Sequence, residues 1–552
     1  MAVITGTSST SNRAARSFKI RLDIANRDLS ILEPRQDDNG DEARYADKSG
    51  TYTKGILQAG IGIVDPMAYQ TFKKALSTGN PADFAAIKLG GTKTLNDPQG
   101  GLSFNLDTLD NAQFTVPPAP PVASDEYATE LVEMYWASLL RDVPFTDYPD
   151  NQIAKDAAAN LSSLQRYKGP RDNNGQVTPQ LLFRGGSADG KTFFGQNFGP
   201  YISQFLIKET TLGGDGDEPS GLPLVQKFRT FEAHHDFMLD PIKFQKVQNG
   251  LDTGDTLKVI DPLFLHDGRG LAALTHKDVL YQEFLVAYLV LNSLKAPSNP
   301  GNPYFPGSPT VPKTQTAKTQ NGFNTFGGPD ISAIIAYVAR QALNAVWYQK
   351  WFIHLRHRPE SGGALVYAKK SQNDTNPPPL PQAAGDLNFS ILDQAVNASF
   401  AKNKSYLLSQ PFPEGSPIHP AYPTGHGTAA GACITVLKFF FDGDFRWIDL
   451  PGLKKSNIFP IEYSRNGSNL LEYKGSDADK LTINGELHKL AHNVTFGHGI
   501  HGGIHWRSDS DTSIQIGEAV ALSFLNHLAH TYNEKFTVHL KKVDGSTATI
   551  SN

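Results

Sequence analysis

Apolar residues recur at helical spacing through several long segments of the chain. In the segment that follows Ser124, they repeat every three or four residues, as one face of an α-helix does. The repeating residues are Leu131, Met134, Tyr135, Leu139 and Leu140. Ser124 stands before this segment, and acidic residues follow it directly. A serine hydroxyl and early carboxylates both stabilise a helix N-terminus, so we expect a helix that Ser124 caps.

The same pattern predicts four more helices and two short β segments. We expect helices over residues 276–296, 330–357, 432–442 and 514–536. The second should end at Arg358, because Pro359 disfavours helical backbone before it. Residues 480–485 and 536–543 read as small hairpins. The pattern therefore predicts a mainly α fold, with helical bundles, long loops and a few short β-hairpins.

Three proline-rich stretches, at 116–124, 296–312 and 376–385, predict extended surface connectors. No repeat of 20–50 residues is found. We therefore expect one unit over 1–552. Its N-terminal part, approximately 1–270, should hold helices and loops, and 271–552 should form the bundle that carries the chemistry.

Composition narrows the possible partners and compartments. The 552 residues carry a net charge of -4, so a nucleic acid or a membrane surface is not expected as partner. No apolar run approaches the length of about 18 residues that a membrane span needs. Basic residues interrupt the N-terminal segment, so no secretory signal is visible and an intracellular location is the default. The single cysteine, Cys433, excludes an internal disulfide and is expected to be buried.

The first candidate for chemistry is the turn "PTGHG" at 423–427. Thr424 is a suitable N-cap, and the N–H groups of Gly425, His426 and Gly427 would then point out of the helix end. Together with the helix dipole they favour a tetrahedral oxyanion. The plainer alternative is an ordinary capped helix with a solvent-facing histidine.

Two further stretches supply charge and imidazole groups. Lys350 and Arg358 are eight residues apart, about 80° around an ideal helix, so both could reach one anion. Two cations near a helix C-terminus can also simply complement the dipole. His498, His501 and His505 follow in "FGHGIHGGIHWRSD" at 496–509, and we expect some of them to be functional.

In this order, the three stretches resemble the signature of the vanadium-dependent haloperoxidase and type 2 phosphatidic acid phosphatase superfamily. The likeness is greatest to red-algal and cyanobacterial bromoperoxidases. It extends to "YQKWFIHLRHRPESGG" (348–363), "EGSPIHPAYPTGHG" (414–427), "GELHKLAHNVTFGHG" (485–499) and "GPYISQFL" (199–206). It therefore covers most of the chain.

The resemblance implies a mainly α-helical fold with vanadate held at one end of a bundle. It implies that His505 bonds vanadium directly, and that His426 contacts the apical oxygen and serves as acid and base. The equatorial oxygens would be held by Lys350, Arg358, Thr424 and the amide of Gly425. His419 matches a histidine typical of bromoperoxidases, where fungal chloroperoxidases have Phe. Apart from the resemblance, we expect Asp509 to orient His505 through its free ring nitrogen or to pair with a nearby arginine.

The activity that the resemblance implies is oxidation of a halide by hydrogen peroxide. The product would be a hypohalous acid equivalent that halogenates a small organic acceptor, with no change in the oxidation state of vanadium. Red-algal relatives form large symmetric assemblies, so a homo-oligomer is expected.

Three positions depart from the family pattern. Thr424 stands where the family usually has Ser. Gly499 stands where it usually has Arg, and either His498 or His501 could fill that place. Trp347 stands where red-algal relatives have Arg, and we expect it to shift halide preference.

Other functions remain possible from the sequence. An acid phosphatase of the same superfamily would use His505 as nucleophile, but the long gaps between the motifs and the missing arginine argue against it. A zinc hydrolase could use His498, His501 and His505, although no HExxH motif occurs. A structural shell protein with a decayed site is the non-enzymatic alternative.

Overall fold

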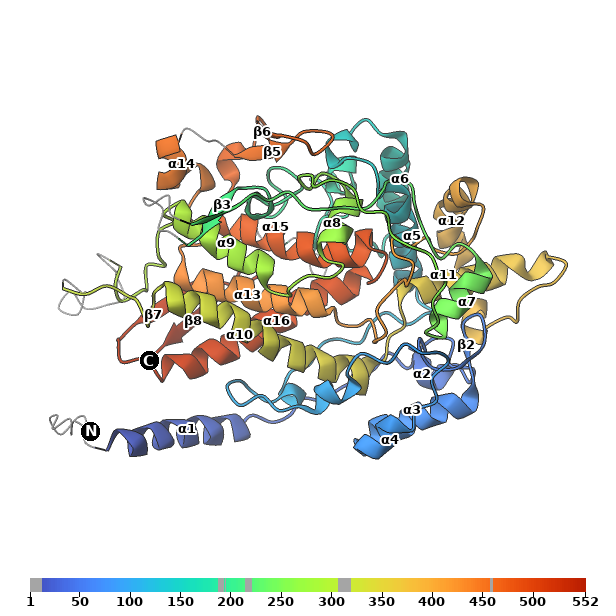
Figure 1. Cartoon of the computed structure of the whole chain (residues 1–552), viewed down its shortest axis with the longest axis horizontal. Coiled ribbons are helices and arrows are strands. Elements are labelled where there is room, and N and C mark those ends of the chain that lie inside the picture. The colour runs from blue at the N-terminus through green and yellow to red at the C-terminus, as the bar shows by residue number, and fades with distance from the viewer. Residues whose placement is uncertain (1–11, 187–192, 194, 214–220, 306–318, 457–459) are drawn as a thin grey trace.

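A computed structural model describes residues 12–186, 193, 195–213, 221–305, 319–456 and 460–552 (Figure 1). The described chain is mainly helical. Its α-helices are α1 (Arg13–Leu29), α2 (Asp41–Arg44), α3 (Pro66–Thr78), α4 (Pro81–Ala85), α5 (Asp125–Leu140), α6 (Gln152–Ser163), α7 (Pro241–Gln248), α8 (Gly268–Leu274), α9 (Gln282–Ser293), α10 (Gly328–Tyr348), α11 (Pro359–Lys370), α12 (Phe389–Asn403), α13 (Gly425–Phe440), α14 (Pro451–Ser456), α15 (Ile483–Phe496) and α16 (Arg507–Ala529).

The strands form four separate two-stranded antiparallel sheets among the described residues. They are β1 (Gln58–Gly60) with β2 (Ile63–Val64), β3 (Thr210–Leu212) with β4 (Leu222–Leu224), β5 (Ile461–Tyr463) with β6 (Leu470–Glu472), and β7 (Thr537–Lys541) with β8 (Thr547–Ser551). The mainly α fold with short hairpins is thus confirmed.

Helix α13 lies at the centre of the bundle and packs against α10, α15 and α16 (Figure 1). Small residues allow this close packing. A Cβ at Gly431 would overlap the backbone carbonyl of Ile514 in α16, and one at Gly427 would overlap the side chain of Ser513. The N-terminus of α13 is therefore held tightly against the start of α16.

The predicted cap of α5 is confirmed, because the Ser124 hydroxyl accepts from the Tyr127 N–H at 3.1 Å. Helix α9 lies within the range predicted at 276–296, and α16 overlaps the range predicted at 514–536 but begins and ends seven residues earlier. Strand β7 confirms a strand within 536–543. The hairpin predicted at 480–485 is wrong. Thr482 instead accepts from the Gly485 N–H at 3.1 Å and so caps α15.

The helix predicted over 330–357 ends early. After α10, residues Gln349–His354 form a π-helical segment, and Leu355 then takes a left-handed conformation with φ of 44°. Arg358 is the N-cap of the next helix, α11. Lys350 and Arg358 therefore do not share one helix, and the predicted 80° separation does not apply.

One cluster of buried apolar side chains includes residues from both halves of the chain, from Tyr45 to Ile550. The division near residue 270 remains a prediction. None of the described helices is long and apolar enough to cross a membrane. Cys433 is buried in α13, and burial raises the pKa of its thiol.

Candidate active site

The first part of the site is the N-terminus of α13, where Thr424 is the N-cap. The Thr428 N–H donates to the Thr424 carbonyl at 3.1 Å, so the N–H groups of Gly425, His426 and Gly427 lie before the first intrahelical bond. The Thr424 hydroxyl does not cap the helix as predicted. It is fully buried, and no partner for it is found among the described residues.

Lys350 adds a buried positive charge from the π-helical segment. Its Nζ donates to the carbonyls of Pro420 at 2.9 Å and Ala421 at 2.7 Å, just before the α13 turn. Burial lowers the pKa of Lys350 well below its ordinary value, and the nearby charge of Arg358 lowers it further. An anion placed here would offset both effects.

Arg358 supplies a second buried cation. Its Nε donates to the His419 carbonyl at 3.0 Å and its Nη1 to the Ile504 carbonyl at 3.1 Å. Nη1 also lies 2.7 Å from Nε2 of His505, and Nη2 lies 3.0 Å from Nδ1 of His419. Burial lowers the pKa of Arg358 to about 10, against the opposing charge of Asp509.

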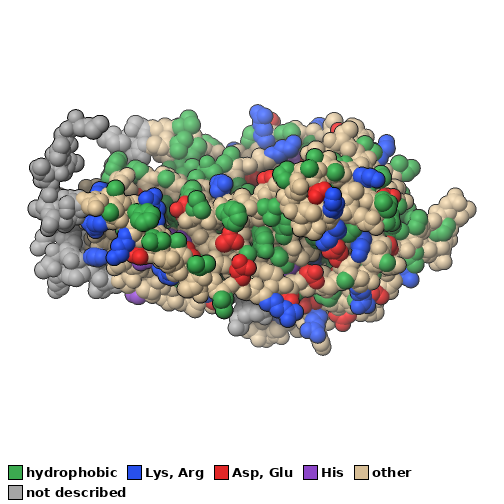
Figure 2. All heavy atoms as spheres, turned by 90° about the horizontal axis from the view of Figure 1, so that it is seen from below, with side chains coloured by type: hydrophobic (Ala, Val, Ile, Leu, Met, Phe, Trp, Pro, Cys, Tyr) green, Lys and Arg blue, Asp and Glu red, His purple; other side chains and the backbone are tan. Residues whose placement is uncertain are grey.

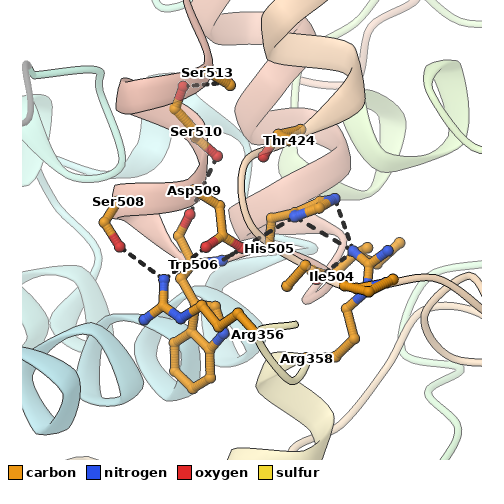
Figure 3. Close-up of polar contacts among 12 residues, drawn as sticks. Arg356, Arg358, Thr424, Ile504, His505, Trp506, Ser508, Asp509, Ser510 and Ser513 are labelled. Atoms are coloured by element: carbon orange, nitrogen blue, oxygen red, sulfur yellow. Dashed lines mark hydrogen bonds and ion pairs between the residues drawn. The ribbon is translucent and has the colours of Figure 1, made fainter. Parts of the chain in front are cut away.

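The ring of His505 contacts both Asp509 and Arg358 (Figure 3). Its Nδ1 lies 3.1 Å from Asp509 Oδ2, a carboxylate oxygen that can only accept, so Nδ1 carries the proton. Nε2 accepts from the Arg358 guanidinium and therefore presents a lone pair. Burial lowers the pKa of His505 well below its ordinary value, as do the charges of Arg358 and Lys350. A neutral imidazole with an available Nε2 is the form that binds a metal.

Asp509 is itself held by Arg356, which the sequence did not single out. Arg356 Nη1 donates to Asp509 Oδ1 at 2.6 Å, and its Nη2 donates to Glu130 of α5 at 2.8 Å. The Trp506 N–H donates to the other Asp509 oxygen at 3.1 Å. The contacts of Asp509 thus match its predicted role in orienting His505. Arg356 holds the Asp509 carboxylate in place and is itself paired with Glu130.

The three clustered histidines have different surroundings. The ring of His498 lies 4.1 Å from that of His426 and 5.6 Å from that of His505, measured between centroids. His501 instead contacts the Tyr201 hydroxyl at 2.9 Å and packs between Phe145 and Phe183. The structure therefore brings His498, not His501, to the site, and the three rings do not surround one zinc position.

His498 is held as a neutral ring. Its Nδ1 donates to the Thr275 carbonyl at 3.0 Å, and burial, followed by the charges of His426 and His505, lowers its pKa well below the ordinary value. An arginine in this place would bring a permanent positive charge. His498 therefore leaves the site with less positive charge than an arginine would give it.

Asp278 is a site residue that sequence analysis missed. His426 Nε2 lies 2.9 Å and 3.1 Å from its two carboxylate oxygens, and Asp278 is nearly buried. Asp278 precedes α9 and is 148 residues from His426. No local motif marks it, so only the tertiary fold reveals this pair.

Trp347 and His419 form one wall of the site. Their rings lie 4.8 Å apart, and the Lys350 ammonium lies 5.9 Å from the Trp347 ring. A Cβ added to Gly425 would lie 3.3 Å from the indole, so the tryptophan covers the start of α13. Burial, then the charges of Arg358 and Lys350, lower the pKa of His419 well below its ordinary value.

The site suits an oxyanion. Of the five buried arginines in the described chain, Arg141, Arg269, Arg356 and Arg507 pair with carboxylates. Arg358 contacts imidazole rings and carbonyls instead. Two buried cations without carboxylate partners, the unpartnered Thr424 hydroxyl and the helix N-terminus can all donate to oxygen atoms of an anion. The His505 Nε2 lone pair contacts one of these cations, Arg358. A compact anion with several oxygens around an electrophilic centre meets these requirements.

Comparisons with known proteins agree with this geometry. Residues 393–534 match the family model of the VCPO second helical-bundle domain. The chain is 30% identical to a vanadium-dependent bromoperoxidase of Ascophyllum nodosum, over 97% of this chain and 91% of that protein. This chain belongs to the vanadium-dependent haloperoxidase family. It is also 29% identical to the vanadium-dependent bromoperoxidase of Corallina officinalis, over 98% of both chains.

A solved haloperoxidase structure has the same fold over the whole chain. It is the homohexameric second vanadate-dependent bromoperoxidase of Ascophyllum nodosum, with a TM-score of 0.84 and 27% identity. The match covers 100% of this chain and 94% of that one. The expected helical haloperoxidase fold is thereby confirmed.

Gly499 lies directly beside His505. A Cβ there would lie 3.0 Å from the Ser510 hydroxyl and 3.2 Å from the His505 Cβ. A side chain at 499 would therefore start directly beside the His505 side chain. This chain has only a hydrogen atom there, and the neighbouring His498 ring lies beside His505 instead.

Proposed function

We propose that this chain is a vanadate-dependent bromoperoxidase. It uses hydrogen peroxide to oxidise bromide, and chloride or iodide as further candidate halides, to a hypohalous acid equivalent that halogenates small organic acceptors. The observation that carries the proposal is the buried pair of cations without carboxylate partners, Lys350 and Arg358, around the available Nε2 of His505.

In this proposal, His505 Nε2 would bind vanadate and the surrounding donors would hold its oxygens. These donors are Lys350, Arg358, the Thr424 hydroxyl and the Gly425 N–H. Arg358 donates to His505 Nε2 at 2.7 Å, so this hydrogen bond would have to open to free the Nε2 lone pair. Vanadate would supply a Lewis-acid centre for the activation of hydrogen peroxide.

His426 is proposed to move protons during the reaction. Its Nε2 faces the Asp278 carboxylate, which fixes the orientation of the ring. The His498 ring packs against the same ring at a tilt and adds no fixed charge. His419 and Trp347 pack against each other at the site, and we propose that halide and acceptor approach beside them.

We also propose a homo-oligomer, because the structural relative from Ascophyllum nodosum is a homohexamer. No membrane and no nucleic acid are needed for this function.

The test is bromination of a diketone dye with bromide and hydrogen peroxide, on protein stripped of metal and titrated with orthovanadate. We expect activity that appears with vanadate and falls when phosphate competes for the same anion site. His505→Ala should abolish it. His539→Ala, which removes an exposed histidine of β7, is the matched control and should retain it.

The phosphatase alternative is tested on the same samples with p-nitrophenyl phosphate. Clear hydrolysis by the vanadate-free protein, together with no bromination at any vanadate concentration, would overturn the proposal. Such a result would assign His505 as a phosphoryl acceptor in the same anion site.

A further inference from the structure

Helix α1 is amphipathic, yet none of its residues is buried. Figure 1 shows it running along the outside of the helical body. Its C-terminal end is tied to α16, where Asp28 pairs with His527 at 3.1 Å and Arg27 contacts His530 at 3.1 Å. Most of the stability of helices in proteins comes from tertiary packing of an amphipathic face, and α1 has no buried residue that would supply it.

The exposed face of α1 carries large apolar side chains. Phe18, Leu22 and Leu29 lie on one stripe of the helix, and Phe18 and Leu29 are 62% and 83% exposed. Ile31, Leu32, Phe104 and Leu106, which follow α1 or lie across from it, are also exposed. Contiguous apolar surface of this kind marks an interaction site more often than a free surface.

A groove of about 1170 Å³ runs beside this stripe. Ala25 and Leu29 of α1 form one wall, and Phe104 and Leu106 form the other. The groove therefore presents apolar walls next to an apolar ridge. Such a surface is self-complementary, because the ridge of one copy can enter the groove of another.

The charges along α1 support the same pairing. Arg13, Arg16, Lys19 and Arg21 lie in its first half. The first turn of a helix favours acidic residues, so Arg13 and Arg16 are in an unfavourable place for an isolated helix. Beyond the second half of α1, Glu33, Asp107 and Asp110 line the groove. Figure 2 shows basic, acidic and apolar side chains exposed together on the face of the molecule seen from below.

We propose that α1 and its groove form an interface with a second copy of this chain, in which two α1 helices pack antiparallel across a two-fold axis. Antiparallel packing places the basic first half of each helix over the acidic groove end of its partner. It also buries Phe18, Leu22 and Leu29 of both copies. This interface rests on the proposed homo-oligomer and specifies which surface builds it.

The first test is the mass of the protein in solution, by size-exclusion chromatography with light scattering. We expect the wild type to be oligomeric and Phe18→Asp/Leu22→Asp to have a smaller assembly mass. Both substituted residues are exposed, so circular dichroism should remain unchanged. Ile242→Asp is the matched control, since Ile242 is exposed on α7, and it should keep the wild-type mass.

Cross-linking tests the antiparallel arrangement directly. Position 22 lies next to the middle of α1, so it should meet its own symmetry mate. Cys433 is buried, so Leu22→Cys adds the one accessible thiol within the described chain. We expect oxidation to give a covalent dimer on a non-reducing gel. Leu471→Cys, at an equally exposed position on β6, should give none.

An unchanged assembly mass in Phe18→Asp/Leu22→Asp would overturn this interface, whatever the cross-linking shows. Binding of a monomeric wild type to anionic phosphatidylglycerol vesicles would also overturn it, in favour of a membrane surface. Bromination is measured on the same samples. A wild-type protein that does not brominate would contradict the proposed function but not the interface.

Discussion

Arg356 and Arg358 are two residues apart and both buried, but only Arg356 is neutralised by carboxylates. Arg356 lies between the carboxylates of Glu130 and Asp509. Burial alone would lower its pKa, but these two acids outweigh burial and raise the pKa above its ordinary value. Arg358 contacts histidine rings and carbonyls, and burial lowers its pKa to about 10.

The presence or absence of carboxylate partners separates an arginine that stabilises the fold, Arg356, from one that can bind an anion, Arg358. Removing one partner from a buried ion pair leaves an uncompensated charge. Removing a buried cation that has no carboxylate relieves desolvation instead. The contacts, and not the burial, therefore distinguish the two roles.

The largest expected effect is on stability, in Arg356→Met. We expect the free energy of unfolding to fall by about 3–5 kcal/mol, because Glu130 and Asp509 lose their shared cation. Arg358→Met should not destabilise the vanadate-free protein. Urea unfolding of both variants measures this difference, and equal losses of stability would remove the distinction between the two arginines.

The reverse order is expected for activity. Arg358→Met should lower bromination by about 10²–10³-fold at saturating peroxide and bromide, the usual effect of removing one donor to a reacting anion. Arg340→Met, which removes an exposed arginine of α10, is the control. Full activity in Arg358→Met, measured across a vanadate titration, would show that the guanidinium does not hold the cofactor.

Asp511 is a control for Asp509, because it is also a buried carboxylate that contacts a histidine and an arginine. Asp511 lies 3.3 Å from His492 and near Arg507, which pairs with Glu133. Asp509→Asn should weaken vanadate binding about 10–100-fold, because it alters the partner that sets the His505 tautomer. Asp511→Asn should leave vanadate affinity unchanged. Equal losses in both variants would indicate a general structural effect.

The depressed pKa of Lys350 predicts a pH dependence of binding. An anion stabilises the charged ammonium, so binding takes up a proton wherever the free site has lost it. Affinity for vanadate should therefore fall as pH rises, by up to about tenfold per pH unit for one proton. The ratio of wild-type to Lys350→Met affinities, from pH 7 to 10, cancels protonation of vanadate itself. A constant ratio would contradict this prediction.

The smallest expected effect is on halide selection. Trp347→Arg replaces an aromatic ring beside Lys350 by a cation, a change worth on the order of 1 kcal/mol. We expect a several-fold change in the ratio of bromide to chloride turnover. An unchanged ratio would show that Trp347 does not influence the halide.

Several features were predictable because their determinants are local. The cap at Ser124 and the α13 turn follow from short sequence signals. The hairpin predicted at 480–485 was wrong because Thr482 caps helix α15, which begins at Ile483 inside that segment. The helix through 357 was wrong because apolar periodicity does not reveal a π-helical segment or the reversal at Leu355.

By itself, the sequence determined the family, the mainly α fold and the groups that can hold an oxyanion, because ordered motifs carry these. Only the tertiary structure decided that His498 and not His501 joins the site, that Asp278 holds His426, and that Arg356 is neutralised while Arg358 is not. The physical reason is that the state of a buried charge depends on the groups packed against it. Glu130 lies 226 residues from Arg356, and no local pattern brings them together.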